Sequence, residues 1–341
     1  MTSVQSLRLS SPHIGELMVE QYEVPDRPPA GGILVAAHVT IVSAGTEIAN
    51  YLGQTTERPP ERVSPYHPGY SFAGEVLAAA DDAERFHPGD RIAGPLGHAA
   101  HAIEDRPERL ARFTHIPDGV SEREAALSQI SCIALNGVRK AGIALGESVV
   151  VVGTGLVGLL AGRLAQLNGA LPLIGLELIP QRRDAAKRFG MDLVLDPADE
   201  TTYTIVESLD RGGADVVIEA TGSPRAFVPG LAMARRGGRV VLLGSTRGHV
   251  EAFSPYDAAH RKGLTIVGAH VSTAPVVGTA NDPWTEAANR RVVLSLMQQK
   301  RLDVAPLISH TIVPTQAGEA FAGLARAPEK YLGIAIDWTR A

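Results

Sequence analysis

The spacing of apolar and polar positions first indicates a β-rich segment that covers residues 1 to about 120. Short apolar or alternating runs are separated there by Pro- and Gly-containing breakers such as Pro88-Gly89-Asp90. The longest run, residues 33–43, predicts a strand, and residues 72–78 and 91–93 predict two more. This arrangement favours a compact, barrel-like all-β domain.

A different pattern begins at residue 147. Residues 148–152 read Ser-Val-Val-Val-Val, a β-branched run that is typical of a buried parallel strand. The turn Gly153-Thr154-Gly155-Leu156-Val157-Gly158 follows at once, and a helical pattern then runs to Leu167. A second apolar run, residues 171–178, contains Glu177. The order is therefore strand, glycine-rich turn, helix, strand and acid.

This order predicts a dinucleotide-binding site. Gly153 would allow the tight turn, Gly155 would let a pyrophosphate approach the backbone, and Gly158 would let the helix pack closely on the strand. The pyrophosphate would bind the free N–H groups at the helix N-terminus. Glu177, about 20 residues further on, would accept hydrogen bonds from the adenosine ribose. The alternative is a glycine-rich turn that binds no dinucleotide.

The rest of the pattern completes an α/β fold with a doubly wound parallel sheet. Ser121-Glu122-Arg123-Glu124 is a capping box that opens a helix to about residue 141, and the domain change is placed near it. Four further strands are predicted at residues 193–195, 215–220, 239–243 and 264–267. With the two strands around the glycine turn, they make a six-stranded nucleotide-binding sheet.

The C-terminal tail is expected to return to the first domain. After a helix pattern at 284–299, it holds a strand, a helix and a strand, at residues 307–312, 316–324 and 332–336. The predicted domains are therefore 1–122 with 304–341, and 123–303, of which the second binds the nucleotide.

Composition and charge narrow the class of function. The length of 341 residues suggests about two domains, and the net charge of −5 provides no basic field for nucleic acid. No apolar run reaches the roughly 18 residues that span a membrane, and the N-terminus lacks a signal-peptide pattern. Cys132 is the only cysteine, which excludes an intramolecular disulfide and a cysteine-built zinc site. These features fit a cytoplasmic enzyme with a small-molecule substrate.

Motifs spread over nearly the whole chain follow one another in a characteristic order. They are Ser43-Ala44-Gly45-Thr46-Glu47, Pro68-Gly69-Tyr70, Gly89-Asp90-Arg91-Ile92, Ile116-Pro117-Asp118-Gly119-Val120, the glycine turn, and residues 72–76, 214–222 and 237–241. In this order they resemble the medium-chain dehydrogenase/reductase superfamily, the relatives of zinc alcohol dehydrogenase. The resemblance implies a GroES-like catalytic domain interrupted by a Rossmann domain, with NAD(P) in the cleft between them. It also implies hydride transfer between nicotinamide C4 and a carbonyl carbon or activated double bond, and a homodimer.

The sequence departs from the zinc-binding members at each ligand position. Ala44 stands at the ligand cysteine, Tyr70 at the ligand histidine, and Ser128-Gln129 where a third Cys or Glu ligand occurs. Ala49 replaces the histidine that relays the proton in many members, and residues 91–116 hold no cysteine for a structural zinc. Because a catalytic zinc needs about three N, S or carboxylate ligands, no metal is predicted.

Hydroxyl groups are the predicted substitutes for the metal. Reduction of a carbonyl places negative charge on oxygen, and without zinc hydrogen-bond donors must stabilise that charge. Thr46 matches the hydroxyl residue that contacts the substrate oxygen in zinc members, and Tyr70 occupies the lost histidine position. The hypothesis is that Tyr70 donates to the substrate oxygen, in one version as the general acid/base, and that Thr46 shares the contact. Alternatively, Tyr70 only fills the space of the zinc and Thr46 only caps the following helix.

Three further residues are placed in the substrate pocket, namely Glu47, His98 and His101. Either histidine would act as a proton shuttle or be structural. A zinc held by these three residues is a remote alternative, because their spacing is not that of metal ligands. Residues 53–67 and 270–284 are expected to shape the pocket.

The predicted cofactor contacts lie in the glycine turn and after later strands of the sheet. They are Gly153, Thr154, Gly155, Leu156, Val157, Gly158, Glu177, Arg182, Thr221, Gly244, Ala269 and His270. Glu177 would repel a 2′-phosphate, which favours NAD. Arg182 and Arg183 would either cradle that phosphate, in which case NADP binds, or be solvated.

The favoured function is a zinc-independent, NAD-dependent dehydrogenase of a secondary alcohol. Ser-x-Gly-Thr-Glu followed by Pro-Gly-Tyr also resembles bacteriochlorophyllide hydroxyethyl dehydrogenases, and Ile308-Ser309-His310 resembles polyol dehydrogenases. A polyol, a sugar-like molecule or a specialised metabolite is therefore the expected substrate. One alternative is an NADPH-dependent quinone or enone reductase, since most zinc-free members have that activity. The non-enzyme alternative is an NAD-binding sensor or interaction protein.

Overall fold

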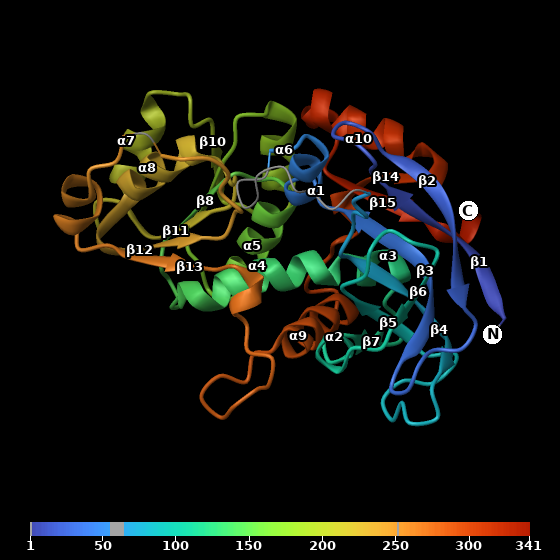
Figure 1. Cartoon of the computed structure of the whole chain (residues 1–341). Helices are drawn as coiled ribbons and strands as arrows, with labels where there is room; N and C mark the ends of the chain where they lie inside the picture. The colour runs from blue at the N-terminus through green and yellow to red at the C-terminus, as the bar shows by residue number, and fades with distance from the viewer. Residues whose placement is uncertain (1, 55–64, 251) are drawn as a thin grey trace. The chain divides into compact units, whose positions relative to one another are not determined.

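A computed structural model describes residues 2–54, 65–250 and 252–341 of the chain. The described chain divides into two units: unit 1 comprises residues 1–132 and 274–341, and unit 2 comprises residues 133–273 (Figure 1). Most of the predicted pocket segment 53–67 lies outside the described residues.

Unit 2 is built on a parallel sheet of six strands. The strands are β8 (Val149–Val152), β9 (Leu173–Leu176), β10 (Leu193–Leu195), β11 (Ala214–Glu219), β12 (Ala234–Leu242) and β13 (Thr265–Gly268). They pair in the order β10-β9-β8-β11-β12-β13, all parallel. The order reverses beside β8, as in doubly wound nucleotide-binding sheets. The predicted α/β fold class is confirmed.

The helices of unit 2 connect these strands. They are α5 (Leu156–Leu167), α6 (Pro180–Arg188), α7 (Thr201–Glu207) and α8 (Pro224–Met233), with a π-helical turn at Tyr256–His260 and a 3-10 turn at Val271–Thr273. All four valines of β8 are buried, because a central strand of a parallel sheet is covered on both faces. Burial on both faces explains why the sequence of this strand is a continuous β-branched run.

Asp215, near the start of β11, is hydrogen-bonded to Ser148, just before the start of β8. One carboxylate oxygen accepts from the backbone N–H and the hydroxyl of Ser148, both at 2.9 Å. The other accepts from Arg211 at 2.8 Å and from Arg235 at 2.6 Å. Burial alone would raise the pKa of Asp215, but the hydrogen bonds from Arg235, Ser148 and Arg211 outweigh it and hold this pKa far below its usual range.

Replacing Asp215 by Asn is expected to destabilise the folded chain by about 2 kcal/mol at neutral pH, because several hydrogen bonds to a charge are lost. Because the pKa of Asp215 is lower in the folded chain than in the unfolded one, its carboxylate adds to the free energy of unfolding at pH values above the unfolded pKa of about 4. This contribution is lost as the pH falls through the folded-state pKa. The difference between wild type and variant should therefore shrink below about pH 4 in denaturant unfolding. Asp257→Asn, which removes an exposed helical pair, should change stability little. A difference that is independent of pH would contradict this account.

Unit 1 holds a seven-stranded sheet and a hairpin. The hairpin pairs β1 (Ser3–Ser10) with β2 (Met18–Pro25). The sheet comprises β14 (Ile308–Ile312), β15 (Gly333–Asp337), β3 (Ile33–Val42), β4 (Phe72–Ala79), β5 (Arg91–Gly94) and β7 (Thr114–His115) in this order, and β6 (His101–Glu104) pairs with β3. The tail therefore returns to the first part of the chain: β15 lies antiparallel to β3, red beside blue in Figure 1.

The helices of unit 1 differ from the sequence expectation in two places. They are α1 (Thr46–Tyr51), α2 (Pro107–Leu110), α3 (Glu122–Ala126), α4 (Ser128–Ala141, which runs on into unit 2), α9 (Glu286–Gln298) and α10 (Ala317–Arg326), with 3-10 turns at Ala305–Leu307, Pro314–Gln316, Pro328–Lys330 and Trp338–Arg340. The predicted helix 121–141 is broken at Leu127, which ends α3 behind the confirmed capping box of Ser121 and Glu124.

The second difference concerns α9, which the predicted boundary assigns to the nucleotide-binding domain. In the structure it belongs to unit 1. Its Glu286 accepts from Arg112 at 2.8 Å, and its buried Arg290 donates to Gln129. These partners are distant in sequence, so the helical pattern alone did not reveal them.

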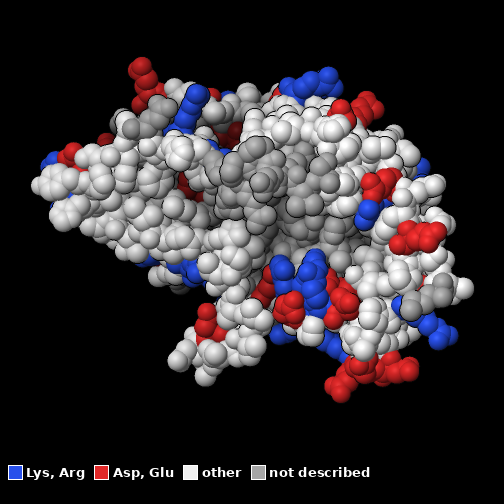
Figure 2. Space-filling view, viewed as in Figure 1, with Lys and Arg blue, Asp and Glu red and all other residues white. Residues whose placement is uncertain are grey.

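Charged side chains of both signs lie close together on the face drawn in Figure 2, where the described residues form no broad field of one sign. The described helices are all too short or too polar to cross a bilayer.

Candidate functional site

The glycine turn of unit 2 connects β8 to α5. Gly153 has a φ of +88°, in the left-handed region that favours glycine. A Cβ on Gly158 would lie 1.9 Å from the carbonyl oxygen of Gly153, so only glycine lets the helix come this close. Gly155 differs: the nearest atom to a Cβ there would be Nη1 of Arg182, at 4.0 Å. The space over Gly155 is thus open, and a guanidinium borders it.

Glu177 joins the end of β9 to the glycine turn. Its carboxylate accepts from the backbone N–H groups of Thr154 and Ile179, each at 3.0 Å. The side chain is largely buried, at 8% exposure. Arg183 pairs with Asp196 at 2.9 Å and donates to the carbonyl of Glu177, so it is a structural residue of this corner. Arg182 is the arginine that lies toward the turn.

The remaining predicted cofactor residues lie at the ends of β11, β12 and β13. Thr221 donates its N–H to buried Glu219 at 2.7 Å, and burial raises the pKa of that glutamate. A Cβ on Gly244 would lie 2.4 Å from the nitrogen of Gly222. The carbonyls of Ala269 and His270 accept from Asn136, which the sequence analysis did not single out. Such strand ends are where doubly wound sheets bind ligands.

In unit 1 the structure brings Tyr70 and Thr46 together. Burial and the nearby charge of Glu47 raise the pKa of Tyr70 well above its usual value, and hydrogen bonds with Ser43 and Thr46 offset part of this rise. Thr46 is the first residue of α1, whose N-cap Gly45 has no side-chain cap bond. The alternative that Thr46 caps this helix is therefore not supported.

Glu47 and His98 form a buried pair, and each side chain is 0% exposed. His98 Nε2 lies 2.7 Å from Glu47 Oε2, and His98 Nδ1 lies 2.8 Å from the hydroxyl of Thr40. Trp338 donates to the same hydroxyl at 2.9 Å. The expectation that Glu47 and His98 face a substrate is corrected: both are enclosed by protein and bonded to each other. Thr40 and Trp338 were missed, because nothing in their local sequence marks them.

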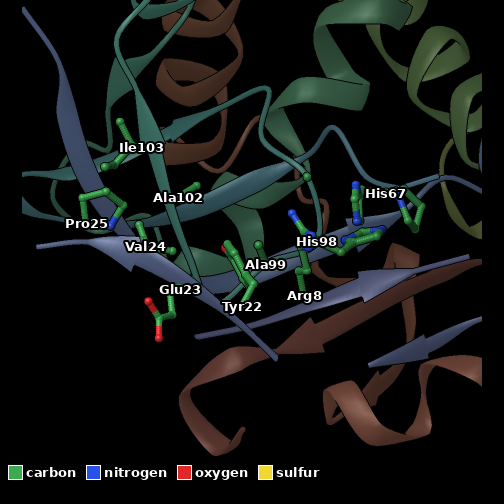
Figure 3. A pocket seen from close by; sticks show the side chains of 12 residues that line it. Arg8, Tyr22, Glu23, Val24, Pro25, His67, His98, Ala99, Ala102 and Ile103 are labelled. Atoms are coloured by element: carbon green, nitrogen blue, oxygen red, sulfur yellow. The ribbon is translucent and has the colours of Figure 1, made fainter. Parts of the chain in front are cut away.

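Figure 3 shows a pocket of about 310 Å³ in unit 1, with His67 and His98 at one end and Pro25 and Ile103 at the other. His98 contributes almost no surface, since its residue exposure is 1%. Arg8 and His67 both contact the Glu20 carboxylate, at 2.5 Å and 3.3 Å. Neither Thr46 nor Tyr70 is among the residues that line this pocket.

His101 does not line that pocket either. Its Nδ1 lies 3.1 Å from the hydroxyl of Ser6, and burial lowers its pKa. It is therefore a partly buried residue of β6, bonded to β1.

The residues at the superfamily's zinc positions do not suit zinc. Ala44 offers no donor atom, the buried hydroxyl of Ser128 has no hydrogen-bond partner among the described residues, and Gln129 accepts from Arg290. Among residues 2–54, 65–250 and 252–341, no cluster of three or more His, Cys, Asp or Glu side chains is arranged to hold a metal. The alternative of zinc on His98, His101 and Glu47 therefore finds no support.

Comparison with known proteins finds similarity to dehydrogenases at the level of family, sequence and structure. Residues 157–289 match the family described as zinc-binding dehydrogenase. The chain is 26% identical over 254 residues to D-guloside 3-dehydrogenase of Escherichia coli K12, covering 74% of this chain and 72% of the relative. It is 24% identical to human sorbitol dehydrogenase, covering 94% and 92%. A putative zinc-binding dehydrogenase from Sinorhizobium meliloti, solved with NADP, superimposes with a TM-score of 0.80 at 22% identity, covering 98% and 99%.

Proposed function

Because this chain belongs to the medium-chain dehydrogenase/reductase superfamily, in its alcohol-dehydrogenase-like part, we propose that it is a nicotinamide-dependent dehydrogenase of a secondary alcohol that works without a catalytic zinc. The observation that carries the proposal is a pair of hydroxyl groups beside the zinc-ligand positions. Tyr70, which stands at one of these positions, hydrogen-bonds with Thr46, while Ala44 at another supplies no ligand.

The cofactor residues of unit 2 fit a dinucleotide. The open space over Gly155 admits a pyrophosphate to the N–H groups that begin α5, and Arg182 adds a positive charge beside it. Glu177 holds the turn in place through Thr154 and retains acceptor capacity for the ribose hydroxyls. When bound, NAD(P) supplies the nicotinamide that accepts or gives the hydride.

Tyr70 acts in this proposal as a hydrogen-bond donor. A phenol is protonated at neutral pH, since its ordinary pKa is about 10, and burial raises the pKa of Tyr70 further. Tyr70 therefore donates to the oxygen on which negative charge develops during carbonyl reduction. The hydroxyl of Thr46 shares this contact. The same pKa argues against Tyr70 as a base at neutral pH.

The proposed substrate class is a polyol or a sugar-like secondary alcohol, since curated relatives are named sorbitol dehydrogenase and D-guloside 3-dehydrogenase. A panel of such alcohols, their ketones and enones, assayed with NAD and NADP, tests the proposal. Alcohol oxidation by a protein free of zinc in elemental analysis is expected. Enone reduction alone would favour a reductase, and tight NAD binding without any turnover would favour a sensor. Light scattering tests the proposed homodimer.

We expect NAD to give a higher kcat/KM than NADP, by about tenfold, the effect of roughly 1.4 kcal/mol. The reason is the repulsion between the Glu177 carboxylate and a 2′-phosphate. A side-by-side assay measures the ratio, and a reversed ratio would refute the preference.

Arg182→Ala separates two roles of the arginine. It should raise KM for both cofactors if Arg182 contacts the pyrophosphate, and for NADP alone if it binds a 2′-phosphate. Lys187→Ala, an exposed cation on the same helix, is the control.

A further inference from the structure

A second pocket of unit 1, which we call the arginine pocket after Arg85 and Arg291 in its wall, has a volume of about 310 Å³. This lies at the lower end of the roughly 300–1,000 Å³ that small-molecule sites span. Helix α9 and strand β7, which pack against each other (Figure 1), supply most of its described lining. None of the described residues that line it is Asp or Glu, and none belongs to the hydroxyl pair or to the glycine turn.

The charges of the two arginines are not neutralised by a described carboxylate. Arg85 donates to the backbone carbonyls of Leu110 at 3.2 Å and Phe113 at 2.5 Å, which orients its guanidinium without cancelling its charge. Arg291 is exposed on α9, and its guanidinium forms no hydrogen bond or ion pair with a described residue. Burial lowers the pKa of Arg85, and the positive charges of Arg291 and Arg290 lower it further. The two guanidinium groups of the pocket therefore repel each other.

A carboxylate beside the pocket is engaged by other groups. Asp90 Oδ2 lies 3.1 Å from Nε2 of His115, a residue of the lining, and accepts from the backbone N–H of His87 at 2.8 Å. Within the described chain Asp90 forms no ion pair with Arg85 or Arg291. It therefore does not offset the charge of the two arginines.

Two hydroxyl groups belong to the same lining. Thr114 is only 6% exposed, and its hydroxyl has no hydrogen-bond partner among the described residues. A buried polar group without a partner is costly. The hydroxyl of Ser295 accepts from Gln299 at 3.1 Å, so its own proton remains free to donate. The wall of the arginine pocket thus contains two charged donors and two neutral ones.

We propose that the arginine pocket binds a phosphate group between the guanidinium groups of Arg85 and Arg291, with Thr114 and Ser295 as additional donors. A phosphate carries close to two negative charges at neutral pH and has acceptor oxygens in several directions. It therefore matches two positive charges, whereas a carboxylate brings one. The planar fork of arginine is suited to phosphate, because it donates two parallel hydrogen bonds.

Calorimetric titration of the full chain with inorganic phosphate, in a buffer without other phosphate, tests this site. Arg291→Gln is expected to raise the Kd at least about tenfold, because charge-assisted hydrogen bonds are lost. The variant should melt at the same temperature as wild type or higher, since a repulsion is removed. Phosphate should raise the melting temperature of wild type and leave that of the variant unchanged. Arg326→Gln removes an exposed arginine of α10 outside the pocket and should keep the wild-type Kd.

Two further variants locate the binding. Arg182→Ala should leave this Kd unchanged, although the glycine turn of unit 2 is proposed to bind a pyrophosphate. Phosphate binding that is lost in Arg182→Ala and retained in Arg291→Gln would overturn the proposal, and so would a wild-type protein that binds no phosphate. Thr114→Val keeps the charge and the shape of the wall and should raise the Kd severalfold. An unchanged Kd in Thr114→Val would overturn the contact with this hydroxyl.

The source of the phosphate group is identified with two other ligands. Pro117 and Leu294 add apolar surface to the lining, which suits the carbon part of a phosphate monoester. Tighter binding of glycerol 3-phosphate than of inorganic phosphate would identify a monoester, and the reverse order would identify the free ion. Acetate should bind more weakly than either, and equal binding of acetate would contradict a site for a dianion. These titrations need neither the cofactor nor turnover, so their outcome is independent of the proposed dehydrogenase activity.

Discussion

Tyr70→Phe is expected to lower kcat/KM about 100- to 1000-fold on the best substrate, the loss that follows removal of one donor to a developing oxyanion. The fall should lie mainly in kcat, because the bond is strongest when the oxygen carries charge. The ring remains, so packing and the melting temperature should change little. Steady-state kinetics with NAD and a thermal melt measure both quantities.

The controls come from the same cluster. Thr46→Val removes the second hydroxyl and should reduce kcat to a lesser degree, whereas Tyr66→Phe removes a neighbouring phenol that accepts from Asn50 at 3.1 Å and should leave kcat near wild type. Wild-type turnover in both Tyr70→Phe and Thr46→Val would mean that the tyrosine only fills the space of the missing zinc.

Gly158→Ala is expected to abolish cofactor binding and to destabilise the folded chain by about 3 kcal/mol or more. The new Cβ would meet the carbonyl oxygen of Gly153 at 1.9 Å, and backbone atoms cannot move aside as a flexible side chain can. The helix would have to shift away from the turn, which displaces the N–H groups proposed to bind the pyrophosphate. Calorimetric titration with NAD and denaturant unfolding measure the two effects.

Gly230→Ala is the matched control for Gly158→Ala, since Gly230 is also a helical glycine of unit 2. Its Cβ would contact Val217 at an ordinary 3.8 Å. The change should be neutral or stabilising by up to about 1 kcal/mol, because alanine favours a helix over glycine. NAD binding retained in Gly158→Ala would show that the turn is not the pyrophosphate site.

Local patterns explain why much of the nucleotide-binding unit could be predicted. A buried parallel strand needs a continuous apolar run, and a tight strand-to-helix turn needs glycines at set spacings. Both signals lie in consecutive residues, so β8 and the start of α5 could be predicted from the local sequence. The capping box at Ser121 is local for the same reason. The alternation of strands and helices then predicts a parallel sheet, whereas its strand order was given by the structure.

The loss of ligands at the zinc positions could also be read from the sequence. A side chain such as that of Ala44 cannot become a ligand in any conformation. What the fold decided is how the remaining polar groups are used. The Glu47 carboxylate meets a histidine 51 residues away, and Trp338 donates to a threonine 298 residues away. No local periodicity encodes such contacts, because they depend on how β3, β15 and α1 pack together. Only the tertiary structure therefore showed that two expected pocket residues, Glu47 and His98, form a buried pair.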